Sequence, residues 1–332
     1  MAERLRWADS LKGCLMLLVV TGHSIQAVLG DGCFEDHAWN LIYSFHMPAF
    51  MAVSGWLSYR PDSKASVGVG RYVVRRARQL LVPYLLWSLL ILVFRRDVSV
   101  QGLAAVFQHP DLFFWFLWAL FFICLVFQLT VWLSQRLHVS VTAASVICGL
   151  LLMALMVAGD LHVFGFRYIA YYFLFYVLGY VLHHHPLHIR SKGVLAVLVL
   201  VWGVLAWFWN MHSLPGWFPA VPHIPASLLL YAYRGLTATV AIVLLVNLFP
   251  RLPGHSDRAV WMGRHSLGVY TAHITFIEVV TMTAGLAWMP RMPALCELLL
   301  FATALAFSVI VVWLLTRNRK TTGLLLGIIS SS

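Results

Sequence analysis

The chain has 332 residues, of which 61% are hydrophobic and only 11% are charged, and its mean hydropathy is +0.84. Soluble domains carry roughly a quarter of their residues as charged side chains, so this composition excludes a soluble globular protein. The formal net charge is +11. The sequence therefore predicts an integral membrane protein with a surplus of basic residues.

Apolar windows of about 20 residues, the length that crosses a bilayer core as a helix, recur along the whole chain. We expect an all-α, polytopic membrane protein of about ten transmembrane helices, in a single domain over residues 1–332. A short cytoplasmic tail over residues 317–332, and no appended soluble domain, are also expected. The expected spans are 11–29, 39–59, 80–94, 112–133, 139–157, 164–182, 193–210, 226–249, 266–288 and 294–316.

The basic residues are distributed unevenly between the two sides of the membrane that these spans define. If the N-terminus is cytoplasmic, 17 of the 23 Lys and Arg residues fall in cytoplasmic segments and four fall in outer loops. Cytoplasmic loops of membrane proteins carry such an excess. Both termini are therefore expected to be cytoplasmic, and the basic charge needs no nucleic-acid partner.

The first expected span carries a polar stripe. Lys12 and His23 are eleven residues apart, which is about three helical turns and roughly 16 Å along the axis, so they share one face. Asp9 precedes Lys12 by three residues and can reach its ammonium group. Because ionisable side chains inside a span are costly, this stripe indicates a functional site. Ordinary interfacial roles for Asp9 and Lys12 are the alternative.

Further ionisable residues lie inside later spans. By residue count, His46, Arg234 and Glu278 fall at nearly the depth of His23, and His273 precedes Glu278 in the ninth span. His23 and His46, at one level on consecutive antiparallel helices, can share a cavity. Hydrogen bonds that simply bridge two helices are the alternative for each of these residues.

A basic stretch, RYVVRRARQLLVPYLLW, leads into the third expected span. Arg75 and Arg78 are three residues apart, so they are neighbours on one helix face. Such a pair suits the phosphates of a coenzyme A thioester, because guanidinium groups bind phosphate oxygens bidentately. Charge that sets the topology and binding of anionic lipid headgroups are the alternatives.

Taken in order, these motifs resemble acyltransferase family 3, a large family of bacterial membrane acyltransferases, and within it the fucose 4-O-acetylase-like branch. The family's first-helix pattern is Arg, ten residues and His; here Lys12 takes the Arg position and His23 follows. The stretch SFHMPAFMAVSGWL is similar to the family's signature around His46, and Arg75 with Arg78 match its Arg-x-x-Arg element. Lys12 departs from the pattern, because an ammonium group does not bind bidentately.

Two later stretches are also similar to the family. They are WFLWALF, which begins at Trp115, and GRHSLGVYTAH, which ends at His273. The resemblance implies that an acyl group, most often acetyl from cytoplasmic acetyl-CoA, is moved to a sugar hydroxyl of a cell-envelope or exported polysaccharide such as an exopolysaccharide or O-antigen. It places the protein in the bacterial inner membrane.

The resemblance also implies roles for single residues. His23 is expected to be the general base or a transient acyl carrier, and both roles stay open. His46, Lys12 and Asp9 are expected to assist it, and the donor phosphates are expected at Arg75 and Arg78. The expected substrate pocket is lined by Trp115, Arg234, Tyr270, His273 and Glu278.

The expected partners are acyl-CoA, a glycan or lipid-linked saccharide acceptor, and membrane lipids. No bound cofactor is expected, and five cysteines without a CxxC pair indicate no metal site. Two alternatives remain: a transporter or flippase whose intramembrane His and Glu residues relay protons, and an acyltransferase that uses succinyl-CoA.

Overall fold

The computed structural model describes residues 5–58, 69–159, 161, 163–219, 221–222, 224–283 and 292–328. Every regular element in these ranges is helical, which confirms the all-α class. The chain forms two compact units, unit 1 from Met1–Val53 and His185–Ala306, and unit 2 from Ser54–His184 and Phe307–Ser332. Two of the three boundaries between the units fall within α3 (His46–Trp56) and α14 (Pro293–Thr316), and the third follows the end of α9 (Phe166–His184).

Within the described residues, seven helical segments are long and apolar enough to cross a membrane. Each corresponds to one of the ten spans expected from the sequence. The seven segments are Arg6–Glu35, Gly70–Arg95, Trp115–Leu137, Val141–Gly159, Val163–His184, Ala226–Arg251 and Pro293–Thr316. The count of ten spans and the cytoplasmic position of both termini stay predictions.

The other three expected spans are also helical but shorter. The span expected at 193–210 forms α10 (Lys192–Trp207), and the span expected at 266–288 forms α13 (Ser266–Thr283), with its expected end outside the described residues. The span expected at 39–59 is divided into α2 (His37–Tyr43) and α3. Pro48 explains this division, since it has no N–H to donate to the carbonyl group four residues earlier, at Ser44.

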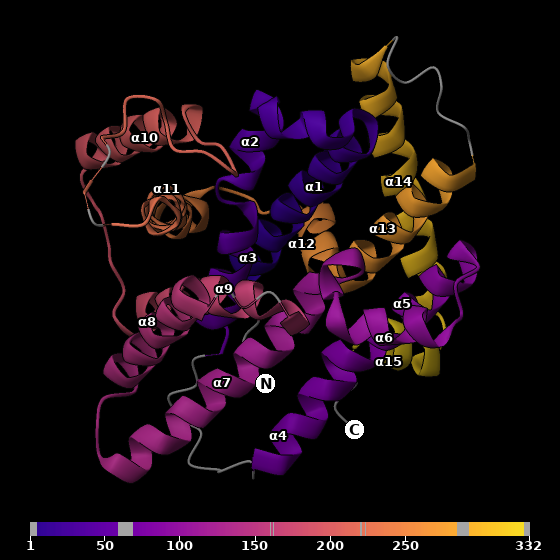
Figure 1. Ribbon diagram of the computed structural model, residues 1–332, viewed down its shortest axis with the longest axis horizontal. Helices are drawn as coiled ribbons and strands as arrows, with labels where there is room; N and C mark the ends of the chain where they lie inside the picture. Colours follow the sequence, from indigo (N-terminus) through magenta and orange to yellow (C-terminus); the bar gives the residue numbers. More distant parts are fainter. Residues whose placement is uncertain are drawn as a thin grey trace. The chain divides into compact units, whose positions relative to one another are not determined.

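Unit 1 is built around α1 (Arg6–Leu29), the helix with the predicted polar stripe. Figure 1 shows the short helix α12 (Asp257–Arg264) and α13 packed against α1, and α10 beside α11 (Ala226–Leu248). At one end of the unit, aromatic and aliphatic side chains form a buried cluster that joins α1, α2, α10 and α11. Its buried members are Ile25, Cys33, Trp39, Ile42, Trp209 and Tyr233.

Unit 2 contains three long helices that pack side by side, α7 (Trp115–Leu137), α8 (Val141–Gly159) and α9 (Phe166–His184) (Figure 1). Its first part is one helical run of α4 (Val69–Arg76), a π-helical turn over Ala77–Leu81 and α5 (Val82–Arg95). The short helix α6 (Val100–Gln108) follows, and Tyr84 donates a hydrogen bond to the carbonyl oxygen of Val106.

The tail expected after the last span contains one more helix, α15 (Arg319–Leu326), which packs on α5 in unit 2. Trp87 Nε1 donates a hydrogen bond of 3.0 Å to the carbonyl oxygen of Leu325. Gly327 ends α15 with a φ of 63°, and a Cβ atom at this position would collide with the carbonyl group of Gln79. The tail therefore packs directly against the π-helical turn.

Candidate active site

The N-terminal half of α1 is held against α12 by direct backbone contact. A Cβ atom added to Gly263 would collide with the carbonyl group of Asp9, and one added to Gly13 would collide with that of Ala259. Only glycine at both positions allows the two helices to approach this closely. The contact fixes α12 relative to the polar stripe.

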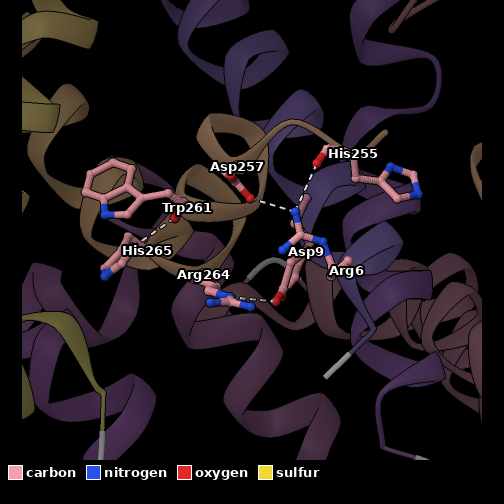
Figure 2. Close-up of polar contacts among 8 residues, drawn as sticks. Arg6, Asp9, His255, Asp257, Trp261, Arg264 and His265 are labelled. Carbon is pink, nitrogen blue, oxygen red and sulfur yellow. Dashed lines mark hydrogen bonds and ion pairs between the residues drawn. The ribbon is translucent and has the colours of Figure 1, made fainter. Parts of the chain in front are cut away.

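Asp9 is the centre of an ion-pair cluster at this contact. Its side chain is 3% exposed, and its two carboxylate oxygens lie 3.2 Å from Lys12 Nζ and 3.2 Å from Arg264 Nε. The predicted contact between Asp9 and Lys12 is thus present, and Arg264 adds a second cation that the sequence did not indicate. Figure 2 shows Arg264 reaching Asp9 from α12.

A second ion pair holds the beginning of α12. Arg6 Nη2 lies 2.6 Å from Asp257 Oδ1 and donates a further hydrogen bond of 3.1 Å to the carbonyl oxygen of His255 (Figure 2). The hydrogen bond from Arg6 lowers the pKa of the Asp257 carboxyl below its ordinary value. This pair is exposed to solvent, so it contributes little to stability.

His23 lies fourteen residues after Asp9 on α1, and its ring contacts His273 of α13. Nδ1 of His23 lies 2.9 Å from Nε2 of His273, and the two rings stack at 5.1 Å between centroids. His273 is fully buried, whereas His23 is partly buried. The sequence placed both residues in the site but did not pair them.

The hydrogen bonds of this pair determine which nitrogen atoms carry protons when both rings are neutral. Nδ1 of His273 lies 2.8 Å from the carbonyl oxygen of Val269, and since a carbonyl oxygen only accepts, this nitrogen donates. Nε2 of His273 is then an acceptor, and Nδ1 of His23 donates to it. Nε2 of His23 is left with a lone pair, as a general base or nucleophile requires.

His46 lies in the first turn of α3 and is 2% exposed. Its Nδ1 donates a hydrogen bond of 2.7 Å to the carbonyl oxygen of Ile42, and its ring meets the edge of Tyr43 at 4.6 Å. By the same reasoning, the Nε2 atom of a neutral His46 is an acceptor. His23 makes its hydrogen bond to His273, and the cavity expected to be shared by His23 and His46 stays a prediction.

The other expected pocket residues of unit 1 have different surroundings. Tyr270 is 2% exposed, with its ring 5.9 Å from that of His273. Glu278 lies further along α13 and is partly buried. The guanidinium group of Arg234 lies over the rings of Trp209 and Tyr231, at 5.5 and 5.6 Å, and donates to the carbonyl oxygen of Met211. Arg234 is therefore part of the aromatic end of the unit.

The two arginines of unit 2 that are expected to bind the donor lie at the beginning of the π-helical turn. Arg75 lies in α4 and is partly buried, whereas Arg78 lies in the turn and is exposed. Arg76, which the sequence analysis did not select, contacts Tyr72 and donates to Gln79 at 3.3 Å. Such π-helical turns are frequent at functional sites and change which side chains share a helix face.

Trp115 begins α7, and its ring stacks on Tyr168 and Tyr172 of α9 at 4.6 and 5.2 Å. Arg167 lies over the ring of Tyr168 at 4.8 Å. This group is an aromatic surface of the kind that carbohydrates and interfacial anchors both use. Among the described residues, no group of three or more His, Cys, Asp or Glu side chains is arranged to hold a metal ion.

Helices of this length and hydropathy are typical of a membrane protein, and two of them, α1 and α13, bring the imidazole rings of His23 and His273 into contact. An acyltransferase domain model matches residues 5–317, nearly the whole chain. The chain therefore belongs to the acyltransferase 3 family, and it is a multi-pass membrane acyltransferase. This match confirms the resemblance to acyltransferase family 3 that the motifs indicated. It favours an acyltransferase over the transporter alternative.

Two curated relatives, both named nodulation protein NolL, are similar to part of the chain. The protein of Mesorhizobium japonicum is 34% identical over 150 residues, which are 42% of this chain and 39% of the relative. The protein of Sinorhizobium fredii is 38% identical over 120 residues, 33% of this chain and 32% of the relative. The match thus covers between about a third and two fifths of the relatives' length. No solved structure matches.

Proposed function

We propose that this protein moves an acetyl group from acetyl-CoA to a sugar hydroxyl of a cell-envelope or exported polysaccharide, from the inner membrane of a bacterium. The observation that supports this most is the chain of hydrogen bonds from Val269 through His273 to His23. It leaves a proton acceptor inside a membrane acyltransferase, where the hydroxyl group of a sugar needs a base in order to react.

In the proposed reaction, Nε2 of His23 takes the proton of the sugar hydroxyl as its oxygen attacks the thioester carbonyl carbon. The C–S bond then breaks, and the thiolate of coenzyme A takes the proton back from His23. While His23 is an imidazolium, its Nδ1–H continues to donate to Nε2 of His273, which stabilises the charge. His273 is thus a positioning residue and does not need to accept the proton.

The same lone pair also suits the second role that the sequence leaves open, an acyl carrier. In that reaction, Nε2 of His23 attacks the thioester and coenzyme A leaves before the sugar binds. Exchange of label between acetyl-CoA and free coenzyme A, in the absence of an acceptor, separates the two. The general base predicts no exchange, whereas a carrier predicts exchange that His23→Ala abolishes.

Unit 2 supplies the remaining parts of the proposal. We assign a phosphate group of the donor to Arg75 and Arg78, and an acceptor sugar face to Trp115 with Tyr168. Arg78 is exposed, as a residue that meets a soluble nucleotide has to be. Both termini are cytoplasmic in this proposal, so that the donor enters from the cytoplasm.

Mass analysis of surface glycans tests the proposed function. A strain without this protein should lose acetyl esters from one glycan, and the wild-type chain should restore them. Loss of a succinyl ester instead would assign a succinyl donor to the same site, and an unchanged glycan would contradict the proposal. The analysis identifies acyl group and acceptor together.

A further inference from the structure

We propose that Arg264 binds a phosphate group of the donor. This phosphate belongs to the pyrophosphate of the acyl-CoA whose thioester reaches His23. The inference rests on the proposed function for the identity of the donor, and on unit 1 alone for the geometry. It gives a residue of α12 a role in binding the donor.

The position of Arg264 is fixed by its neighbours. Gly263, the residue before it, packs directly on the carbonyl group of Asp9, and Arg264 Nε lies 3.2 Å from Asp9 Oδ2. At the other end of α12, Arg6 holds Asp257. A guanidinium group held through its Nε atom has lost most of its freedom before a ligand arrives, which lowers the entropy cost of binding.

The charges around Arg264 favour an anion. Asp9 carries one negative charge and contacts two cations, Lys12 and Arg264, so the three side chains together carry one surplus positive charge. Asp257, the next acidic residue on α12, is paired with Arg6 (Figure 2).

Arg264 also keeps the donors that a phosphate needs. Its contact with Asp9 uses Nε, and within the described part of the chain this is the hydrogen bond that Arg264 makes. The terminal nitrogen atoms carry four further N–H groups, and the side chain is 40% exposed. Two of these groups can bind two oxygens of one phosphate in parallel, as guanidinium groups do in phosphate sites.

The distance between Asp9 and His23 along α1 indicates which molecule carries the phosphate. Asp9 and His23 are fourteen residues apart on one helix, which is roughly 21 Å. The pantetheine arm has about 14 bonds between the phosphorus atom and the thioester carbon, or roughly 17 Å when extended like a peptide chain. A phosphate at Arg264 thus leaves the thioester close to His23, whereas a lipid headgroup has no reason to lie at this spacing.

The test uses the full chain in phosphatidylcholine vesicles with three thioesters: acetyl-CoA, acetyl-dephospho-CoA, which keeps the pyrophosphate, and S-acetylpantetheine, which has no phosphate. Arg264→Gln should raise the KM for the first two by about 10- to 100-fold, the loss expected for hydrogen bonds between charged groups. Its KM for S-acetylpantetheine and its kcat should stay within about twofold of wild type.

Two further variants serve as controls. Arg264→Lys keeps the charge but not the bidentate geometry, so its KM for acetyl-CoA should lie between those of wild type and Arg264→Gln. Arg258→Gln removes an equal charge from an exposed position of the same helix, and its KM for acetyl-CoA should stay within about twofold of that of wild type. A shift in Arg258→Gln as large as that in Arg264→Gln would overturn the proposal in favour of a general charge effect.

Equal KM values for acetyl-CoA in wild type and Arg264→Gln would also overturn the proposal. So would a rise in the KM of Arg264→Gln for S-acetylpantetheine as large as its rise in KM for acetyl-CoA. If Arg264 binds a lipid headgroup instead, its substitution should change activity only in vesicles that contain phosphatidylglycerol, and the KM for acetyl-CoA should not change.

Binding of free coenzyme A, measured by the rise in melting temperature, separates this proposal from the proposed function. Loss of binding in Arg264→Gln supports the phosphate site even if acetyl transfer is absent, and retained binding contradicts it.

Discussion

Nδ1 of His23 and Nε2 of His273 lie 2.9 Å apart, although the two residues are 250 positions apart in the sequence. The contact joins α1 to α13 and continues to the carbonyl oxygen of Val269. In the proposed reaction, one helix provides the reactive nitrogen, and the other determines which nitrogen that is. The resulting proton arrangement resembles the way in which a catalytic dyad orients its base.

Removal of His273 should affect the rate rather than substrate binding. In His273→Ala, Nδ1 of His23 loses its acceptor, so the ring can adopt the other tautomer and orientation. We expect kcat to fall by about 10- to 100-fold, less than the loss of the base itself, with KM unchanged. Steady-state kinetics with acetyl-CoA measure this, with His188→Ala, an exposed histidine of the same unit, as the control. An unchanged kcat would show that His273 has no positioning role.

The contact between α1 and α12 should not tolerate a methyl group. Gly263→Ala forces the added carbon against the carbonyl group of Asp9, and we expect the protein to lose about 1–3 kcal/mol of stability. Gly203→Ala is the matched control, because a Cβ atom at that position of α10 meets nothing within 4 Å. Melting temperatures in detergent compare the two variants, and equal values would contradict the close helix contact.

The pair between Arg6 and Asp257 should be sensitive to pH. Since the pKa of Asp257 is lowered in the folded protein, its contribution to stability is present above the ordinary pKa of an aspartate and is lost as the pH falls through the lowered value. The melting temperature of Arg6→Gln should therefore differ from that of wild type at pH 7, and the difference should disappear as the pH falls below the lowered pKa of Asp257. Added salt at pH 7 should reduce the difference, because the pair is exposed. A difference that persists at low pH would assign it to other contacts of Arg6.

If Arg75 and Arg78 of unit 2 bind the donor as proposed, their substitution should act on the affinity for the thioester. Arg75→Ala combined with Arg78→Ala is expected to raise the KM for acetyl-CoA by about tenfold or more with little change in kcat. Arg71→Ala removes a neighbouring exposed charge and serves as the control. An unchanged KM together with poor membrane insertion would instead assign these arginines to topology.

The sequence predicted the features of this site that depend on one helix. The spacing of Asp9, Lys12 and His23 predicted a single helix with an ion pair at one end, and α1 contains all three with Asp9 bonded to Lys12. The 3.6-residue period is enough for such a prediction, because it requires no knowledge of what packs on the helix.

Features that depend on two helices were not predictable in the same way. The partner of His23 is set by how α1 meets α13, and residue counts alone favoured the neighbouring helix that carries His46. Arg264 lies between the spans expected at 226–249 and 266–288, and the eight residues of α12 are too short and too polar to indicate a helix there. Two glycines, Gly13 and Gly263, were the available signal for that contact.

The division of one expected span into α2 and α3 had a visible cause. Pro48 lies inside the apolar window, but the count of apolar residues gives a proline little weight. The division places His46 in the first turn of α3, where its Nδ1 bonds to the last turn of α2. The interruption thus sets the orientation of an imidazole that the sequence had already selected.

The most direct test of this account compares a strain that carries wild-type protein with one that carries His23→Ala, at equal amounts in the membrane. The acetyl content of the surface glycan is measured by mass spectrometry. We expect the variant to lose the acetyl esters as completely as the deletion does, since removal of a general base costs about 10²- to 10⁴-fold in rate. Normal acetyl content in the His23→Ala strain would contradict the assignment of His23 as the reacting group.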